Sequence, residues 1–523
     1  MKKFYTILGS MLLTGSLFAQ GPADALMISE TQYEGTARSI AMGNAFTALG
    51  GDLGGMAVNP ASTGVYRCSE FTIGPSFIIS GVETNFNGAG NFDRSTRMAM
   101  SNCGFVTTVD TGNSYGLLNW NIGFVANRVK NFNNIVTASG VNSKASMLGA
   151  IASGLNGVNT SLLEKTETYE PYNNPMLAWN EILAYDMYLI DPLPGSEDSY
   201  IGATQNILLD GSLGVGGRLN QDFFSKTTGG INEMTFNFGG NYNDRIFFGV
   251  NFNLETVDYT INDFYAESAL NSLDFDDGIQ SFTANYWQNT SGAGFNAKFG
   301  VIWTPAGGFR LGATYTTPTW YSLTDSWSRE MHSWFDNGNS YPEDGYEFPY
   351  DSRDYKITTP SRFSIGAAYT FGNAGLLSFD YESVNYRAIR MSAADGNSTV
   401  FSDANNIIRT GFNRSDVVRI GGEAWFGTTA VRAGYNFYGS AGALTDINGT
   451  PVYNYSSTNF LSCGLGFRLN NEGSALFDIA YQKMVGGNSE KFTVFDNYDD
   501  VSAPFIYADK SLSKVVMTLA FRF

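Results

Sequence analysis

The 523-residue sequence has a formal net charge of −18, and only 15% of its residues are charged, whereas a soluble domain has roughly 25%. Nucleic-acid binding is excluded as a principal role, because neutralising phosphates requires clustered lysine and arginine. The chain also has 15% aromatic residues and 59 glycines, and it lacks the stretch of roughly 18 apolar residues that a transmembrane helix needs. This composition favours a membrane β-barrel, in which apolar and polar residues alternate.

The first segment in chain order, residues 1–19, has the pattern of a secretory signal peptide. Lys2 and Lys3 precede an apolar stretch over residues 4–18, and Ala19 provides a small residue at a cleavage position before Gln20. We therefore expect the mature protein to be exported. No cysteine follows the cleavage position, so the sequence does not support a lipidated N-terminus.

Residues 20–69 form a second segment that has neither a strand pattern nor a regular helix pattern. Its centre, "GTARSIAMGNAFTALGGDLGGMAVNPASTG" (35–64), is rich in glycine and yet carries apolar side chains at intervals. One interpretation is a periplasmic linker. The other is a plug, or hatch, that folds into a barrel, where glycines allow close approach to the wall. The candidate gate residues are Ile40, Met42, Phe46, Leu49, Met56, Asn59, Pro60 and Ala61.

From residue 70 to residue 523 a period of two recurs, as in Phe248, Val250 and Phe252 alternating with glycine and asparagine. Such alternation indicates strands with one apolar and one polar face. It predicts an all-β fold, a fourteen-stranded antiparallel transmembrane β-barrel. The predicted strands cover 70–80, 97–109, 115–129, 231–242, 245–260, 291–303, 308–322, 360–371, 375–387, 417–426, 429–437, 458–469, 474–484 and 512–523.

The connections between these strands alternate between short and long, as in outer-membrane barrels with tight periplasmic turns and long extracellular loops. Both termini are then periplasmic. The longest insertion, 130–230, should contain structure of its own. Its apolar residues at helical spacing either pack on each other and on the barrel rim, or form a vestibule for a hydrophobic ligand. The vestibule candidates are Met147, Leu148, Ile151, Leu155, Trp179, Ile182, Leu183 and Met187.

Two motifs then carry a family resemblance. The segment "ARSIAMGNAFTALGGDLGGMAVNPAS", with its Asn59-Pro60-Ala61, resembles the N-terminal hatch of the FadL/OmpP1/TodX transporters of long-chain fatty acids and other hydrophobic compounds. The last strand ends on Phe523, which resembles the C-terminal signal read by the outer-membrane assembly machinery. The chain is most similar to the larger Bacteroidetes branch, some members of which are labelled hemin receptors.

The resemblance implies a non-enzymatic protein of the outer membrane of a Gram-negative bacterium, which takes up hydrophobic compounds by passive diffusion gated by the hatch. Its expected partners are outer-membrane lipids, a hydrophobic small molecule and, during biogenesis, the assembly machinery. In the family, cargo leaves sideways near a kinked early strand. Gly123 in the third strand is the candidate for such a kink. No cofactor or metal is expected, and the very long 130–230 loop prevents transfer of the family's ligand-contact residues.

Two alternative functions remain open. His332 is the only histidine, and it is the candidate axial ligand if the barrel is a hemin receptor. A related branch of the family supplies a barrel subunit to a secretion machine. A general diffusion porin is disfavoured, because a plug opposes water-filled conduction. Acidic clusters at 273–278 and 496–500 lack EF-hand spacing and are interpreted as solvated loops. The widely spaced Cys68, Cys103 and Cys463 do not indicate zinc or a disulfide framework.

Overall fold

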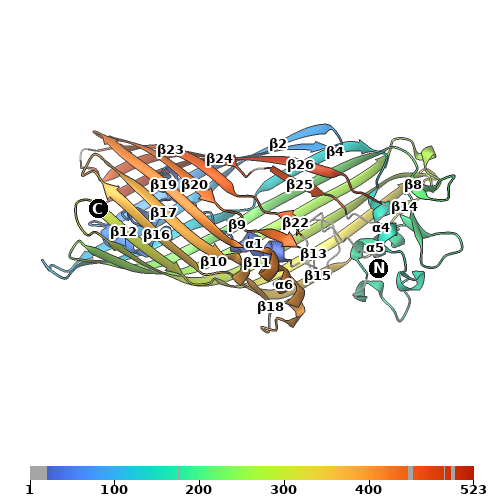
Figure 1. Ribbon diagram of the computed structural model, residues 1–523, viewed down its shortest axis with the longest axis horizontal. Coiled ribbons are helices and arrows are strands. Elements are labelled where there is room, and N and C mark those ends of the chain that lie inside the picture. The colour runs from blue at the N-terminus through green and yellow to red at the C-terminus, as the bar shows by residue number, and fades with distance from the viewer. Residues whose placement is uncertain (1–20, 175–176, 446–450, 471, 488, 496–500) are drawn as a thin grey trace.

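The computed structural model describes residues 21–174, 177–445, 451–470, 472–487, 489–495 and 501–523. The predicted signal peptide and the acidic cluster at 496–500 lie outside these ranges. Within them, 14 antiparallel strands close into a barrel, because the last strand pairs with the first from Glu70↔Arg522 to Phe86↔Ile506. Figure 1 shows the tilted strands of this wall. The strands are β1 (Glu70–Phe86), β2 (Ala89–Asp110), β3 (Leu117–Asn131), β9 (Leu219–Tyr242), β10 (Ile246–Ala269), β11 (Ile279–Trp303), β12 (Phe309–Thr316), β16 (Arg362–Thr370), β17 (Gly375–Asn385), β19 (Arg414–Phe426), β20 (Thr429–Tyr438), β23 (Thr458–Arg468), β24 (Ala475–Gly486) and β26 (Phe505–Arg522).

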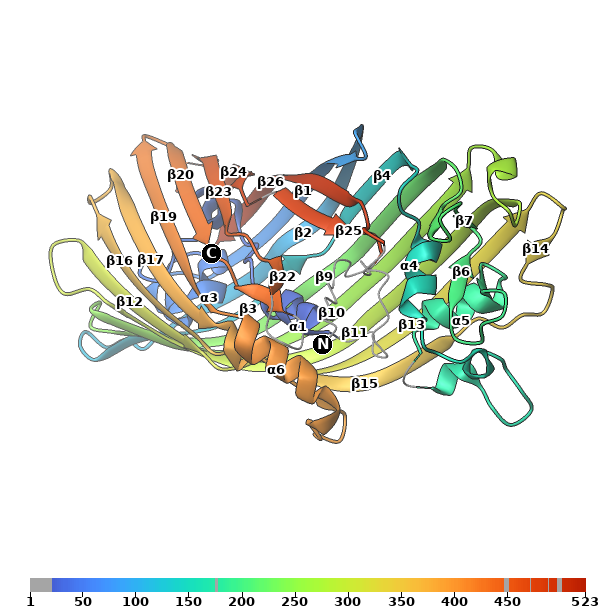
Figure 2. The same cartoon turned by 45° about the vertical axis from the view of Figure 1, so that its right-hand side comes forward.

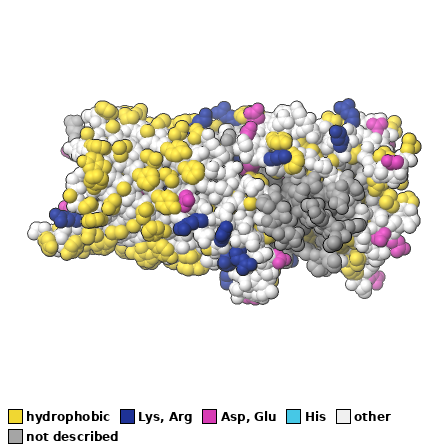
Figure 3. Space-filling view, in the orientation of Figure 1, with side chains coloured by type: hydrophobic (Ala, Val, Ile, Leu, Met, Phe, Trp, Pro, Cys, Tyr) yellow, Lys and Arg dark blue, Asp and Glu magenta, His cyan; other side chains and the backbone are white. Residues whose placement is uncertain are grey.

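The two faces of the wall follow the predicted alternation. On β10 the side chains of Phe248 and Phe252 point outward and are 46% and 45% exposed, whereas Asn251 and Asn253 point inward and are buried. Exposed apolar side chains of this kind gather over the half of the barrel that carries the short turns (Figure 3). This apolar band is the surface that a β-barrel presents to lipid. We call the end with the C-terminus the short-turn end (Figure 1) and the opposite end the long-loop end.

The predicted strand count is confirmed, but several predicted loops are wrong, because the wall extends well beyond the apolar band. Residues 81–96 are not a long loop, since β1 and β2 continue to a tight turn at Asn87–Gly88. The predicted strand 308–322 is broken after Thr316, where Pro318 has no N–H for the ladder. Further strands extend the wall at the long-loop end: β4 (Asn134–Asn142), β13 (Trp320–Phe335), β14 (Ser340–Tyr341), β15 (Tyr350–Thr358), β18 (Arg390–Ala393) and β25 (Ser489–Thr493).

The middle of the predicted 130–230 insertion, from residue 143 to residue 218 as far as it is described, forms a cap at the long-loop end (Figure 2), whereas the two ends of the insertion belong to the wall strands β3, β4 and β9. The cap contains α4 (Met147–Gly154), η2 (Thr160–Leu162), η3 (Pro171–Asn173), α5 (Trp179–Asp186), β5 (Ile190–Pro192), β6 (Tyr200–Gly202), β7 (Gln205–Ile207) and β8 (Leu213–Val215). The other loops contain η4 (Ser272–Asp274), η5 (Tyr386–Ala388), η6 (Thr399–Phe401), α6 (Ser402–Gly411), β21 (Ala443–Thr445) and β22 (Pro451–Asn454). None of the helices in the described ranges is both long enough and apolar enough to cross a bilayer.

Candidate functional site

The hatch, residues 20–69, lies inside the barrel as far as it is described (Figure 2). It consists of α1 (Pro22–Ser29), α2 (Ala37–Ala41), α3 (Leu53–Val58) and η1 (Pro60–Val65). The short helices start at capping side chains. Thr36 accepts a hydrogen bond from the amide of Ser39, and Asp52 accepts from the amides of Gly54 and Gly55 at 2.8 and 3.2 Å. The hydroxyl of Thr36 also donates to Asp52 at 2.7 Å, so the two caps hold α2 and α3 together.

The Asn59-Pro60-Ala61 motif joins the hatch to the wall. The Asn59 amide group donates to the carbonyls of Thr47 (2.6 Å) and Val301 (3.3 Å), and its oxygen accepts from the amide of Ala61 (2.9 Å). On the next residue, the carbonyl of Pro60 accepts from Asn237 at 3.0 Å. A fully buried asparagine therefore caps η1 and also bonds to strand β11.

The apolar side chains of the hatch pack against the inner wall in separate clusters. Ile40 packs with Ala480 and Val516, and Ala61 packs with Phe247 and Ile302. Met56 packs with Val106 and Val125 of β2 and β3. All eight predicted gate residues are buried: Ile40, Met42, Phe46, Leu49, Met56, Asn59, Pro60 and Ala61. The hatch therefore fills this part of the lumen.

Inward-facing glycines of the wall allow the hatch backbone to approach closely. A β-carbon at Gly421 or Gly434 would overlap the backbone of Met42 and Gly43, and one at Gly312 would overlap Thr47. We call this set the glycine belt, and it contains Gly123, Gly239, Gly249, Gly300, Gly312, Gly366, Gly421, Gly434 and Gly464. Close-packing glycines were predicted only in the hatch, so the glycines of the wall are an additional finding.

Gly123 belongs to this belt and is not a kink, so that prediction is wrong. It pairs with Val106 on one side and Asn237 on the other, inside an unbroken register. A β-carbon there would lie 2.8 Å from the sulfur of Met56. Space for the hatch therefore explains the glycine. The irregularities of β3 lie elsewhere, between Leu117 and Asn119 and between Arg128 and Lys130.

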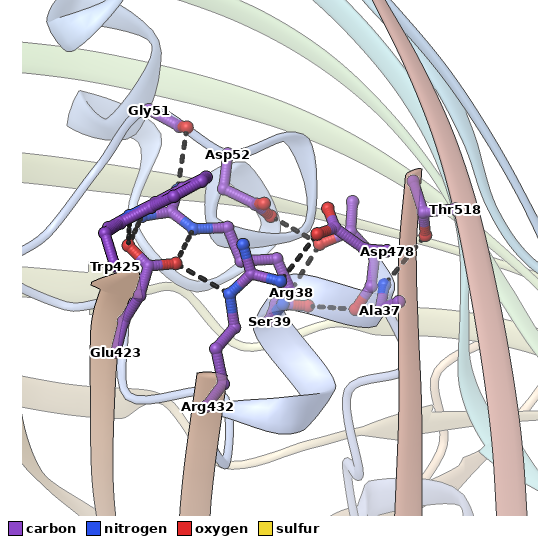
Figure 4. A network of polar contacts seen from close by, with 11 residues as sticks. Ala37, Arg38, Ser39, Gly51, Asp52, Glu423, Trp425, Arg432, Asp478 and Thr518 are labelled. Atoms are coloured by element: carbon purple, nitrogen blue, oxygen red, sulfur yellow. Dashed lines mark hydrogen bonds and ion pairs between the residues drawn. The ribbon is translucent and has the colours of Figure 1, made fainter. Parts of the chain in front are cut away.

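A buried ionic network holds α2 against the wall (Figure 4). Arg38 donates to both carboxylate oxygens of Glu423 on β19, from Nε at 2.9 Å and from Nη2 at 3.1 Å. Glu423 also accepts from Arg432 on β20 at 2.6 Å, and Arg432 in turn donates to Asp478 on β24 at 2.5 Å. The carboxylate of Glu423 is thus shared by one hatch arginine and one wall arginine. We call these four residues the latch network.

A second charged cluster lies beside α1 and the segment that follows it. Lys298 donates to the hydroxyl of Tyr33 at 3.2 Å and to the carbonyl of Ala57. Arg362 donates to the carbonyl of Ser29 at 2.5 Å and forms an ion pair with Glu382 at 3.0 Å. The cavity among these groups measures about 20 Å³, which is room for about one water molecule. The hatch region therefore leaves no wide aqueous channel there.

Asp24 of α1 is the hatch carboxylate whose pKa is shifted most. Enclosure of α1 in the lumen raises the pKa of Asp24 to about 6, because burial disfavours the charged form. A hydrogen bond from the amide of Gly21, at 3.0 Å, opposes this shift.

The wall is interrupted beside the hatch, between β2 and β3. The hydrogen-bonded ladder between these strands ends at Asn102↔Asn127. From there toward the long-loop end, the backbone of β2 forms a ladder with β1 only. The register of β1 and β2 also shifts at Gly74/Pro75, a local irregularity of this hairpin. We call the resulting interruption the β2–β3 notch.

A hatch segment occupies the β2–β3 notch. The amides of Gln32 and Glu34 donate to the carbonyls of Val129 and Arg128 at 2.8 and 3.0 Å, where β3 has lost β2 as a partner. Glu34 is buried, and its carboxylate accepts from Lys514 at 2.6 Å. The ion pair Glu30–Lys130, at 2.6 Å, lies on the same segment. The hatch thus replaces wall hydrogen bonds at the notch.

The predicted vestibule residues do not line an open vestibule. Seven of them are buried in one apolar cluster with the upper wall: Met147, Leu148, Ile151, Leu155, Ile182, Leu183 and Met187. Trp179 packs on the same cluster between Tyr172 and Trp327, with ring centroids 5.1 and 5.0 Å apart. The alternative interpretation, in which the helices pack on each other and on the rim, matches these contacts.

The candidate heme ligand, His332, lies on β13 and points out of the barrel. Its ring packs 5.2 Å from Phe348 and 6.1 Å from Trp334. Its neighbours in the strand, Met331 and Ser333, are the buried, inward-facing residues. No group of three or more His, Cys, Asp or Glu side chains suited to a metal ion occurs in the described part of the chain. The geometry therefore gives no support for His332 as a ligand inside the lumen.

Comparisons with known proteins extend the fold assignment. No protein-family model and no curated protein sequence matches the chain. Among solved structures, the toluene transporter TodX of Pseudomonas putida is similar, with a TM-score of 0.50 and 11% identity, over 94% of this chain and 99% of that chain. A Pseudomonas aeruginosa FadL homologue gives the same four values. A deltaS2 mutant of the TodX monoaromatic hydrocarbon channel is similar with a TM-score of 0.51 and 11% identity, over 93% of this chain and 98% of that chain. The chain therefore has the outer-membrane β-barrel fold of the FadL and TodX transporters.

Proposed function

We propose that this protein takes up hydrophobic compounds across the outer membrane by passive diffusion, and that the hatch gates their passage. The observation that carries the proposal is the combination of a filled lumen with a wall interruption. A barrel whose lumen is packed by gate residues is poorly suited to a water-filled pore. The β2–β3 notch, in contrast, offers a lateral way out in which the hatch segment 32–34 takes the place of β2 beside β3.

The chemistry of the cargo follows from the route. A molecule that leaves through the wall enters the hydrocarbon of the bilayer, and transfer of alkyl or aromatic surface from water into hydrocarbon gains about 0.8 kcal/mol per methylene. A polar solute gains nothing at that step. Long-chain fatty acids and monoaromatic hydrocarbons both satisfy this requirement, and one of the similar solved structures is a toluene transporter. On this account the long-loop end is extracellular and both termini are periplasmic.

The test compares hydrophobic and hydrophilic solutes in proteoliposomes that contain the purified barrel. We expect a labelled fatty acid and labelled toluene to equilibrate faster than in protein-free vesicles, while labelled sucrose does not. Equal acceleration of all three solutes would indicate a general porin and would overturn the proposal.

Deletion of residues 35–62, in a barrel that still shows heat-modifiable migration on gels, should change the uptake rate. An unchanged rate would refute gating while leaving transport itself intact.

A further inference from the structure

A basic hollow lies on the outer surface of the barrel. It measures about 710 Å³ and is lined by Asn385, Arg387, Asn413, Arg414 and Ser440. Figure 3 shows Lys and Arg side chains gathered beside the edge of the apolar band, over the region of α6. The protein as a whole has a net charge of −18, so this local concentration of cations runs against the general charge.

The position of the hollow along the strands coincides with the edge of the membrane. Asn385 and Arg414 are paired and point outward at the ends of β17 and β19. From Phe426 at the short turn to Arg414 there are twelve residues, which cover about 40 Å along the strand and about 30 Å along the barrel axis at the usual tilt. An apolar band is about 25 Å tall. Arg414 therefore lies just beyond the hydrocarbon, at headgroup level.

The change of residue type along these two strands supports that depth. On the outward face of β17, Leu377 and Phe379 are followed by Tyr381, Ser383 and Asn385. On β19, Ile420 is exposed nearer the short turn. Tyrosine at the boundary is typical of the interface. The hollow thus begins where the lipid-facing surface ends.

The two arginines have donors to spare. Arg387 uses Nε and Nη2 on the carbonyl of Phe412 and the side chain of Asn413, at 2.8 and 2.9 Å. Arg414 uses Nε on the hydroxyl of Ser383 at 2.5 Å. A guanidinium has five N–H donors, so several remain on each. In the described part of the chain, neither arginine has a carboxylate partner within 4.0 Å.

The nearest acidic side chain along the strand does not fill the hollow. Asp416, two residues from Arg414, accepts a hydrogen bond from the hydroxyl of Tyr381 at 2.7 Å. Arg390 donates to the carbonyl of Arg387 at 2.8 Å and adds a third positive charge nearby. Paired arginines with amide and hydroxyl groups around them are the donor set that binds phosphate oxygens.

We propose that Arg387 and Arg414, with Asn385, Asn413 and Ser440, bind a phosphate group carried by a lipid headgroup in the leaflet that meets the long-loop end. In a Gram-negative outer membrane the phosphorylated lipid of that leaflet is lipid A. The bound lipid fixes the barrel's depth in the membrane and orders the 386–413 segment, from which Arg387 and Asn413 come. This role is independent of transport.

The test is a lipid titration of the purified, heat-modifiable barrel followed by native mass spectrometry. The probes are bisphosphorylated lipid A, the same lipid after removal of its phosphates, and inorganic phosphate as competitor. We expect the bisphosphorylated form to bind at least roughly tenfold more tightly than the dephosphorylated form, because charge-assisted hydrogen bonds are lost with the phosphate. Arg387→Gln/Arg414→Gln should abolish that preference.

The matched control is Arg94→Gln/Arg245→Gln, which removes the same charge from exposed positions on β2 and beside the β9–β10 turn. It should keep the preference for phosphorylated lipid. Competition by excess inorganic phosphate alone would identify a soluble phosphate as the ligand of the same site. Equal affinity for the two lipids, or an equal loss in both double variants, would overturn the proposal.

Discussion

The latch network makes a quantitative prediction about how firmly the hatch is held. Arg38→Ala removes two charge-assisted hydrogen bonds to Glu423, at 2.9 and 3.1 Å. The Glu423 carboxylate keeps its bond to Arg432. The lost free energy of docking is therefore smaller than the roughly 3–5 kcal/mol expected when a buried charge is left with no partner at all. Bonds to charged groups are worth about 1.5–3 kcal/mol. We therefore expect the docked hatch to lose about 2 kcal/mol.

That loss corresponds to a roughly 30-fold larger population of undocked hatch. Hydrogen exchange measures it directly, because the amides of residues 35–64 exchange through undocked states. We expect their exchange to accelerate by roughly 30-fold while the strand amides of β19 and β20 change little. The control is Arg94→Ala, which removes an exposed arginine from β2, outside the latch network. Unchanged exchange in Arg38→Ala, or an equal effect in the control, would refute the latch.

Three further predictions test other parts of the account. Gly421→Ala should destabilise the docked hatch by about 1–3 kcal/mol in thermal unfolding, because its β-carbon meets the Met42 backbone. Gly422→Ala should be tolerated, since its β-carbon meets mainly the flexible end of the Leu377 side chain. Equal destabilisation by the two substitutions would contradict the role of the glycine belt in docking the hatch. The pKa of Asp24 is raised to about 6 on docking, above the usual value near 3.9. Docking therefore takes up a proton, so protection of α1 amides should be greatest below about pH 4 and fall as pH rises through about 6. Asp24→Asn should remove that dependence, and a persistent dependence would exclude Asp24 as its source. Glu267 holds Ser146 and the amide of Met147 at 2.5 and 2.8 Å, so Glu267→Ala should loosen the cap by about 3 kcal/mol. Limited proteolysis within residues 143–217 measures this, and unchanged cleavage would contradict it.

The strands in the apolar band could be predicted because lipid on one side and a polar lumen on the other enforce a period of two. Between the apolar band and the long-loop end, the contrast between a lipid-facing side and a polar lumenal side disappears. On β13, inward Leu323 and Trp327 are interrupted by inward Asp325 and Arg329, so the pattern weakens and the strand was predicted as a loop. The N-terminal half of β2 was missed for a similar reason, because Arg94 and Thr96 interrupt the outward apolar row that includes Phe92 and Met98.

The hatch contacts could not be predicted, because they join residues far apart in the sequence. Arg38 meets Glu423 across 385 positions, and a single sequence gives no sign of this pairing. The inward-facing charges of β19 and β20 were a usable signal, since charged residues on the lumenal face of a strand require a partner. Gly123 shows the opposite case. A lone glycine in a strand indicates either a bend or a close approach, and only the position of Met56 decides between them.

The central claim is that the hatch must move for a hydrophobic molecule to pass. The amide of Ala37 donates to the hydroxyl of Thr518 on β26 at 2.8 Å. Cysteines at these two positions are therefore close enough for a reversible disulfide between the hatch and the wall. Ala37→Cys/Thr518→Cys, in a chain whose Cys68, Cys103 and Cys463 are replaced by serine, joins α2 to the wall when oxidised. Uptake of a labelled fatty acid into proteoliposomes should stop in the oxidised protein and return on reduction. Equal uptake in the fully oxidised and reduced forms would contradict the account.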